Sequence, residues 1–287
     1  MSQAGSTAKK RQISFWTAIS AAHEGVFGSF RQFAGLAAIP FALSLAIGVL
    51  KIPSGLFIPA SDLIFIALDL LPFAILGVAL NRALLGEEAL GLLSHRLLGR
   101  RTFSYLGYTL LMLLVVVIPI ILLVLVSSGI SAAGYGSGLG TSLGNGFLLL
   151  GIALFLLALY VVARLSLVFP ALSIDRRLGL AGSWRLSRGV GLKLLGVILA
   201  VLFFMVLTGI VGGLVLRSDI NINIGGTVEI IPGASVMDTI LASLPSLTWS
   251  IVVSYAGCGL IVAAYASAYT QLSGWGGPRE EILERFE

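Results

Sequence analysis

The sequence has little charge for its length. Only 11% of its 287 residues are Asp, Glu, Lys or Arg, whereas 57% are hydrophobic, and soluble domains carry about 25% charged residues. A water-soluble fold of this length could not bury so much apolar surface, so the sequence predicts a membrane protein. The single cysteine, Cys258, excludes a disulfide framework.

Residue types that carry catalysis or bind metals are also scarce. The two histidines, His23 and His95, form no cluster with carboxylates, so the sequence predicts no metal, no cofactor and no enzymatic activity. Cys258 lies in an apolar run without a histidine to activate it, and we interpret it as a packing residue. The basic residues are spread over the chain without interleaved aromatics, which argues against binding to nucleic acid.

Long apolar runs are abundant, and a spanning helix needs about 20 mostly apolar residues. Six runs meet this requirement, at roughly 33–50, 63–84, 105–127, 146–168, 192–216 and 242–270. The predicted fold is an all-α, polytopic transmembrane helical bundle. We predict a disordered cytoplasmic tail at 1–12, a six-span membrane domain at 13–272 and a second cytoplasmic tail at 273–287.

The basic residues are distributed unequally between the two sides of this topology. Sixteen of the 18 lysines and arginines fall on one side, and only Lys51 and Arg217 fall on the other. The positive-inside rule puts the basic side in the cytoplasm. Because six is an even number of spans, both termini are predicted to be cytoplasmic, in the inner membrane of a bacterium.

The segment 164–189 contains five arginines, which are Arg164, Arg176, Arg177, Arg185 and Arg188. We predict that they hold this loop in the cytoplasm and contact the anionic headgroups of membrane lipids. The alternative is a site for an anionic ligand or a protein partner. Arg164, together with Asn81 and Arg82, lies at the inner end of a span, where we expect the side chains to extend toward the headgroups.

A cytoplasmic amphipathic segment precedes each pair of spans, which indicates three units of interfacial helix and transmembrane hairpin. In the first segment, helical spacing puts apolar side chains on one face, namely Phe15, Ile19, Val26, Phe30 and Phe33. The second and third segments are 87–101 and 178–189. Outside the membrane, alternating residues around Gly225–Gly226 predict a β-hairpin.

Asp69 is the only acidic residue inside a predicted span. An ionised group in the membrane is costly, so such a carboxylate is a candidate ligand or proton site. The alternative is a structural role, with the side chain bonded to a neighbouring hydroxyl. In either case we expect a polar partner from another span, and Ser250 and Ser254 of the last span are the first candidates.

The segment around Pro170, Ser183, Trp184 and Gly189, the amphipathic start and the final "AAYASAYTQLSG" are similar to one group of proteins. The chain resembles bacterial six-span membrane proteins related to the membrane domain of glycerophosphoryl diester phosphodiesterases. That resemblance implies a fold and little about activity, because hydrolysis in the fused proteins belongs to a separate soluble barrel domain, for which this chain has no room.

Three functions remain open at this stage. The sparse polar groups inside the spans favour a non-catalytic scaffold or accessory subunit of a membrane complex, which would contact other membrane subunits. Asp69, the prolines within the spans and the resemblance favour a transporter or lipid-handling protein. A membrane enzyme is disfavoured because no catalytic constellation is present.

Overall fold

The computed structural model describes residues 15–57, 61–86, 99–133, 139–176, 178–215 and 235–275. Its elements in these ranges are helices, without a strand: α1 (Phe15–His23), the π-helical turn η1 (Glu24–Gly28), α2 (Phe30–Phe57), α3 (Ser61–Leu84), α4 (Arg100–Ala133), α5 (Leu139–Leu165), α6 (Val168–Ser173), α7 (Gly179–Leu186), α8 (Gly191–Val215) and α9 (Val236–Ser273). The predicted all-α class is therefore confirmed.

Six of these helices are long and apolar enough to cross a membrane: α2, α3, α4, α5, α8 and α9. The chain is thus a multi-pass membrane protein. Each helix corresponds to one predicted span. Several extend beyond it by one or more turns, whereas α5 ends three residues and α8 one residue before the predicted end. The last span is a single helix through Pro245, capped at its start by Ser235 and Asp238 and ended by Gly274 in the left-handed conformation, at φ 72°.

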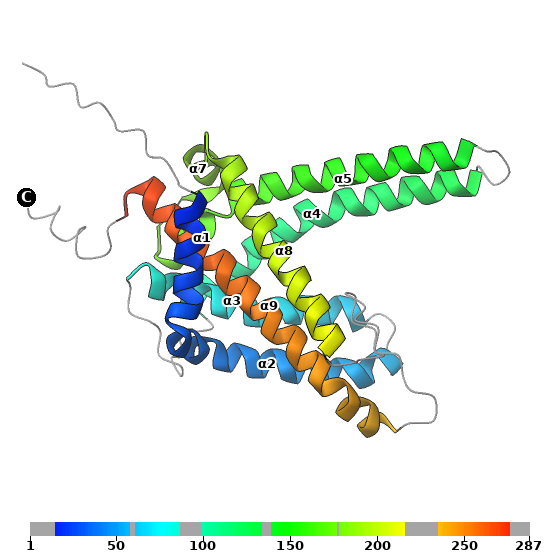
Figure 1. The fold of residues 1–287 in the computed structure, drawn as a ribbon, viewed down its shortest axis with the longest axis horizontal. Coiled ribbons are helices and arrows are strands. Elements are labelled where there is room, and N and C mark those ends of the chain that lie inside the picture. Colours follow the sequence, from blue (N-terminus) through cyan, green and yellow to red (C-terminus); the bar gives the residue numbers. More distant parts are fainter. Residues whose placement is uncertain are drawn as a thin grey trace, which may run out of the picture.

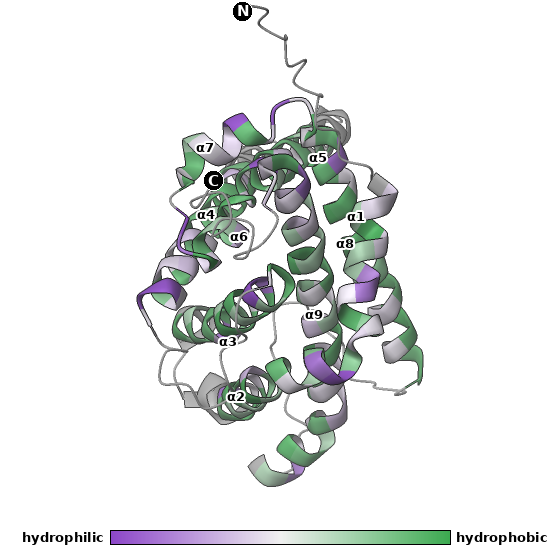
Figure 2. Ribbon diagram, turned by 90° about the vertical axis from the view of Figure 1, so that its left-hand side faces the viewer, coloured by the Kyte–Doolittle hydropathy of each residue, from purple (hydrophilic) through white to green (hydrophobic). Residues whose placement is uncertain are grey.

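Alternate ends of the six long helices lie at opposite ends of the molecule (Figure 1). The last turns of α3 and α9 lie near α1 and α7, whereas the end of α2 and the start of α9 lie at the far end. Helix α9 is the central element, in contact with α1, α2, α3, α6 and α8. Figure 2 faces the end near α1 and α7 and shows hydrophobic residues over most of the helical surface.

The first amphipathic helix differs from its prediction in the face that it buries. Ala18, Ala22 and Val26 pack into the core, whereas Phe30 is 62% exposed. Two features explain this. The π-turn η1 adds a residue to one helical turn and shifts the register of the side chains after it. In addition, small residues allow α1 and η1 to approach α9 closely, since a Cβ atom at Gly25 would lie 3.3 Å from that of Ala263.

Between α5 and α8 the chain forms a compact cap, defined here as α6, α7 and the turns beside them. Leu167, Ala171, Ser173, Ser183 and Ser187 of this cap are fully buried. Helix α6 packs on α3, α4 and α9. The arginine-rich segment is therefore a folded part of the bundle rather than an extended loop.

Helices α4 and α5 form a hairpin that diverges from the other long helices in Figure 1. We call its outer part, residues 113–125 of α4 and 149–157 of α5, the arm. No residue of the arm is buried. The two helices meet the bundle only nearer the cap, where buried side chains such as Tyr105, Met112, Leu159 and Ala163 occur. The arm is thus an apolar projection covered by no other described helix.

Some predictions lie outside the described residues. These are the tail 1–12, most of the second amphipathic segment with His95, Arg177, most of the tail 273–287 and the β-hairpin at Gly225–Gly226.

Candidate functional sites

Asp69 lies on α3 with its side chain half-buried. In the described part of the chain no hydrogen bond reaches its carboxylate, so the expected bond to Ser250 or Ser254 is wrong, and Ser250 is exposed. The charge that acts on Asp69 is instead that of Lys51, on the neighbouring helix α2. Because the two side chains have opposite charges, they attract each other across the α2–α3 hairpin, near the end of the molecule remote from the cap.

A buried pair of hydroxyl groups lies one turn further along α3 from Asp69. The Tyr255 hydroxyl on α9 is 2.9 Å from Ser44 Oγ on α2. Phe73, one turn after Asp69, lies against the Tyr255 ring at a centroid distance of 5.0 Å. Three different helices therefore supply the polar groups near this end of α3, which are Asp69 of α3, Ser44 of α2 and Tyr255 of α9.

A third group surrounds Gly77, one further turn along α3. A Cβ atom at Gly77 would lie 2.6 Å from Cζ of Tyr105, so only glycine leaves room for this ring. Asn81 donates a hydrogen bond from Nδ2 to the Gly77 carbonyl, at 2.8 Å.

Residues 69, 73, 77 and 81 are spaced by four and share one face of α3. With Tyr255 and Tyr105 they form what we call the α3 column, which runs from Asp69 toward the cap. Beyond it, buried Arg82 donates a hydrogen bond from Nη1 to the Ser173 carbonyl at 3.4 Å. Along the column the polar groups form separate pairs, Ser44 with Tyr255 and Asn81 with the Gly77 carbonyl.

Within the cap, Arg164 is bound internally. It donates hydrogen bonds from Nε to Ser187 Oγ at 3.0 Å and from Nη2 to the Trp184 carbonyl at 2.6 Å. Its guanidinium lies 3.6 Å from the centroid of the Trp184 ring. Ser183 donates in turn to the Arg164 carbonyl at 2.8 Å. This arginine fastens α7 to the end of α5.

Two further contacts fix the other side of the cap. Asp175, whose φ is 59°, forms an ion pair with Arg101 of α4. Arg176 lies over the Trp275 ring at 4.2 Å, and Trp275 donates from Nε1 to the Leu85 carbonyl at 3.3 Å. The ends of α3, α4 and α9 are thereby joined through the cap.

Arg185 and Arg188 differ from these residues. Both are exposed, and neither side chain has a hydrogen bond or an ion pair with a described residue. Their predicted contact with anionic lipid, like that of Arg164, Arg176 and Arg177, remains a prediction. Of the four members of this set that the structure describes, Arg185 and Arg188 are the two whose guanidinium groups have no internal partner.

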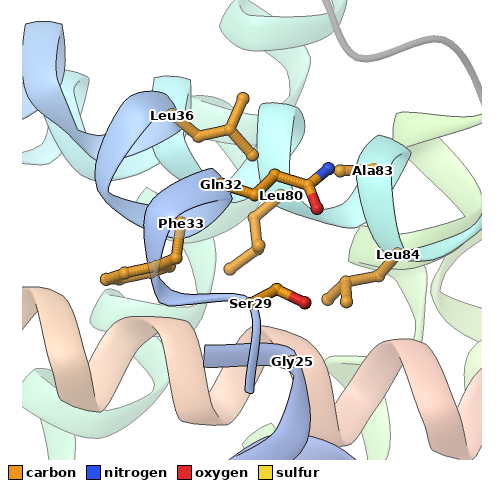
Figure 3. A pocket seen from close by; sticks show the side chains of 8 residues that line it. All are labelled: Gly25, Ser29, Gln32, Phe33, Leu36, Leu80, Ala83 and Leu84. Carbon is orange, nitrogen blue, oxygen red and sulfur yellow. The ribbon is translucent and has the colours of Figure 1, made fainter. Parts of the chain in front are cut away.

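A small pocket lies where η1 and the start of α2 meet the end of α3 (Figure 3). Its volume is about 50 Å³, enough for one or two water molecules. Ser29 and Gln32 supply its polar side chains, and its other walls are apolar. It does not include Asp69 or the arginines of the cap.

The sequence interpretation missed Asn81 and Arg82, which were expected to extend toward the headgroups. Their side chains are only 1% and 9% exposed. The available signal was the spacing of four residues that puts Gly77 and Asn81 on the face of Asp69. Among the described residues no group of three His, Cys, Asp or Glu side chains is arranged to hold a metal ion. Comparisons with family models, curated proteins and solved structures give no match to this chain.

Proposed function

We propose that the protein is a non-catalytic scaffold or accessory subunit of a complex in the bacterial inner membrane, with both termini in the cytoplasm. The observation that carries this proposal is the arm. Of an apolar 18-residue window within the spanning stretch of α4, Arg100–Leu125, 6% is buried, compared with 56% of such windows in α3 and α9. A helix pair so little covered by its own chain offers a large apolar surface to the helices of another subunit.

The length of α4 supports the same proposal. Its 34 residues extend for roughly 51 Å at 1.5 Å per residue, whereas the hydrocarbon core of a bilayer is about 30 Å thick. Helices associate in membranes through close van der Waals packing, and both sides of the arm are open to such packing.

Site-specific photocrosslinking in cells tests the proposal. A photoreactive amino acid is placed at Leu122 or at Leu150 in the arm, and at Phe203 of α8 as a control. All three side chains are large, apolar and more than 45% exposed. We expect one protein adduct of the same mass from both arm positions and none from Phe203.

Two results would contradict this proposal. Adducts with lipid alone at both arm positions would mean that the bilayer covers the arm. An adduct of twice the mass of the chain would make the arm a surface for self-association rather than for another subunit.

The alternative is a transporter that moves protons or small cations, or a lipid-handling protein, with Asp69 in the membrane. The α3 column favours it, because Asp69, a carboxylate without a hydrogen bond in the described part of the chain, shares a face of α3 with Asn81 and lies one turn from Phe73, which packs on Tyr255. An ionisable residue inside a spanning helix is a candidate for a proton or ion pathway.

Proton flux into liposomes that contain the purified chain tests this alternative. A transporter requires a flux above that of empty liposomes, lost in Asp69→Asn and kept in Ser250→Ala, whose side chain is exposed on α9. Asparagine preserves the size of the side chain but has no proton to exchange. Equal fluxes with and without the protein, for protons and for monovalent cations, would exclude ion transport and leave the scaffold.

A further inference from the structure

The arginines in and beside the cap fall into two groups, according to whether their side chains have a partner among the described residues. Arg164 and Arg176 are engaged by aromatic rings and backbone groups of the protein itself. Arg101 is paired with Asp175. Arg185 and Arg188 have no such partner among the described residues and are exposed. The first group, Arg164, Arg176 and Arg101, already contacts groups of the protein. The second group, Arg185 and Arg188, has all of its side-chain N–H donors available for a ligand.

Arg185 and Arg188 lie on one side of the same turn. They are three residues apart, and the Arg188 amide donates to the Arg185 carbonyl at 3.2 Å, so the helical turn continues beyond the end of α7. Residues at this spacing are neighbours on a helix surface. Two parallel guanidinium groups match the oxygens of one phosphate or of two adjacent phosphates.

The surroundings of the pair put it at the membrane boundary. Trp184 is 39% exposed, and Leu192, in the first turn of the spanning helix α8, is 75% exposed. Exposed tryptophan is typical of the headgroup region. Leu192 follows Arg188 by four residues, so the two arginines and an exposed apolar side chain lie within one short stretch of the chain. That combination fits a molecule that has both an acyl chain and an anionic headgroup.

We propose that Arg185 and Arg188, with Trp184 and Leu192 beside them, form a binding site for an anionic phospholipid. The arginines bind the phosphate of the headgroup, and Leu192 contacts the first methylene groups of the acyl chain. The site is independent of the proposed role as a scaffold, because it lies on the cap and not on the arm. It gives the cap a lipid preference that Arg164 and Arg176 do not contribute to.

Lipid titration of the full-length protein, followed by native mass spectrometry, tests the site. The probes are phosphatidylglycerol and phosphatidylcholine, added separately to the protein in a neutral detergent. A basic residue near an anionic surface contributes about fivefold to binding. We therefore expect the preference of the protein for phosphatidylglycerol to fall by roughly 25-fold in the Arg185→Gln/Arg188→Gln variant.

The matched control is Arg31→Gln/Arg100→Gln, which removes the same charge from two arginines that are also exposed, on α2 and α4. It should retain the preference of the wild-type protein. Equal losses in both double variants would mean that general electrostatic attraction and not a site is responsible, and would overturn the proposal.

Inorganic phosphate distinguishes a lipid from a soluble anion. We expect millimolar phosphate to leave phosphatidylglycerol bound, because phosphate has no acyl chain to contact Leu192. Displacement of the lipid by phosphate would contradict the proposal and indicate a site for a soluble anion. A thermal midpoint of the Arg185→Gln/Arg188→Gln variant close to that of the wild type verifies that the fold is intact.

Discussion

Substitution of Gly77 by alanine tests the packing of α4 on the rest of the bundle. The new Cβ atom would lie 2.6 Å from Cζ and 2.9 Å from Cε1 of Tyr105, distances that real Cβ atoms do not adopt. The Tyr105 ring cannot move freely, because it is buried and stacked on Phe169 of α6 at a centroid distance of 4.5 Å. Overpacking of this kind costs about 1–3 kcal/mol.

A glycine-to-alanine change in a helix also has a favourable part of up to about 1 kcal/mol, from helix propensity. Gly107→Ala measures that part alone, since Gly107 is also helical and a Cβ atom there has no neighbour within 4 Å. We therefore expect Gly77→Ala to unfold more easily than Gly107→Ala by about 1–3 kcal/mol. Equilibrium unfolding in mixed micelles, titrated with dodecyl sulfate, gives both free energies.

A double variant attributes the difference to the ring. In a Tyr105→Leu background, Gly77→Ala should lose most of its penalty, because the atoms with which it collides are absent. Equal stabilities of Gly77→Ala and Gly107→Ala, or the same penalty with and without the Tyr105 ring, would refute the described packing of α3 against α4.

Three further predictions concern single residues. Arg164→Ala should destabilise the protein by about 2 kcal/mol, since it removes two charge-assisted hydrogen bonds and a cation–π contact, whereas Arg185→Ala should change stability by less than about 0.5 kcal/mol. The same titration compares the two variants, and equal losses of stability would contradict the distinction between arginines bound within the cap and arginines without an internal partner. Tyr255→Phe should cost about 0.5–1 kcal/mol because the hydroxyl of Ser44 loses its partner, and a simultaneous Ser44→Ala should add little. Gly274→Ala should raise the rate at which a protease cleaves after α9, since alanine at φ 72° is strained by about 1 kcal/mol; an unchanged rate would mean that the cap of α9 does not need glycine.

The spans and their number follow from the sequence because the length and hydropathy of a run determine whether it can cross a bilayer. The same reasoning could not find α6. Its six residues are too few for a helical pattern, and its burial depends on contacts with α3, α4 and α9 that are remote in sequence. Likewise, the π-turn at Glu24–Gly28 changes the buried face of the first helix, and a regular period of 3.6 residues cannot anticipate it.

The candidate sites were predictable to a smaller extent. Asp69 is conspicuous in the sequence because it is acidic and intramembrane, but its electrostatic neighbour Lys51 and the Ser44–Tyr255 pair depend on how α2, α3 and α9 pack together. The sequence alone does not distinguish the five arginines of segment 164–189 from one another. Only the position of a ring, such as Trp184 against Arg164, distinguishes those that stabilise the cap from those that remain available for a ligand.

The most direct test of the account is the topology of the membrane domain. Single cysteines at Arg31, Arg188 and Ser235, in a Cys258→Ala background, are treated with a membrane-impermeant maleimide in spheroplasts and again after lysis. All three positions are exposed, the first two at the end near the cap and the third at the start of α9. The account predicts labelling of Ser235→Cys from outside, and of Arg31→Cys and Arg188→Cys only after lysis. Labelling of Arg188→Cys in intact spheroplasts, or of Arg31→Cys and Ser235→Cys from the same side, would contradict the six-span arrangement with a cytoplasmic cap.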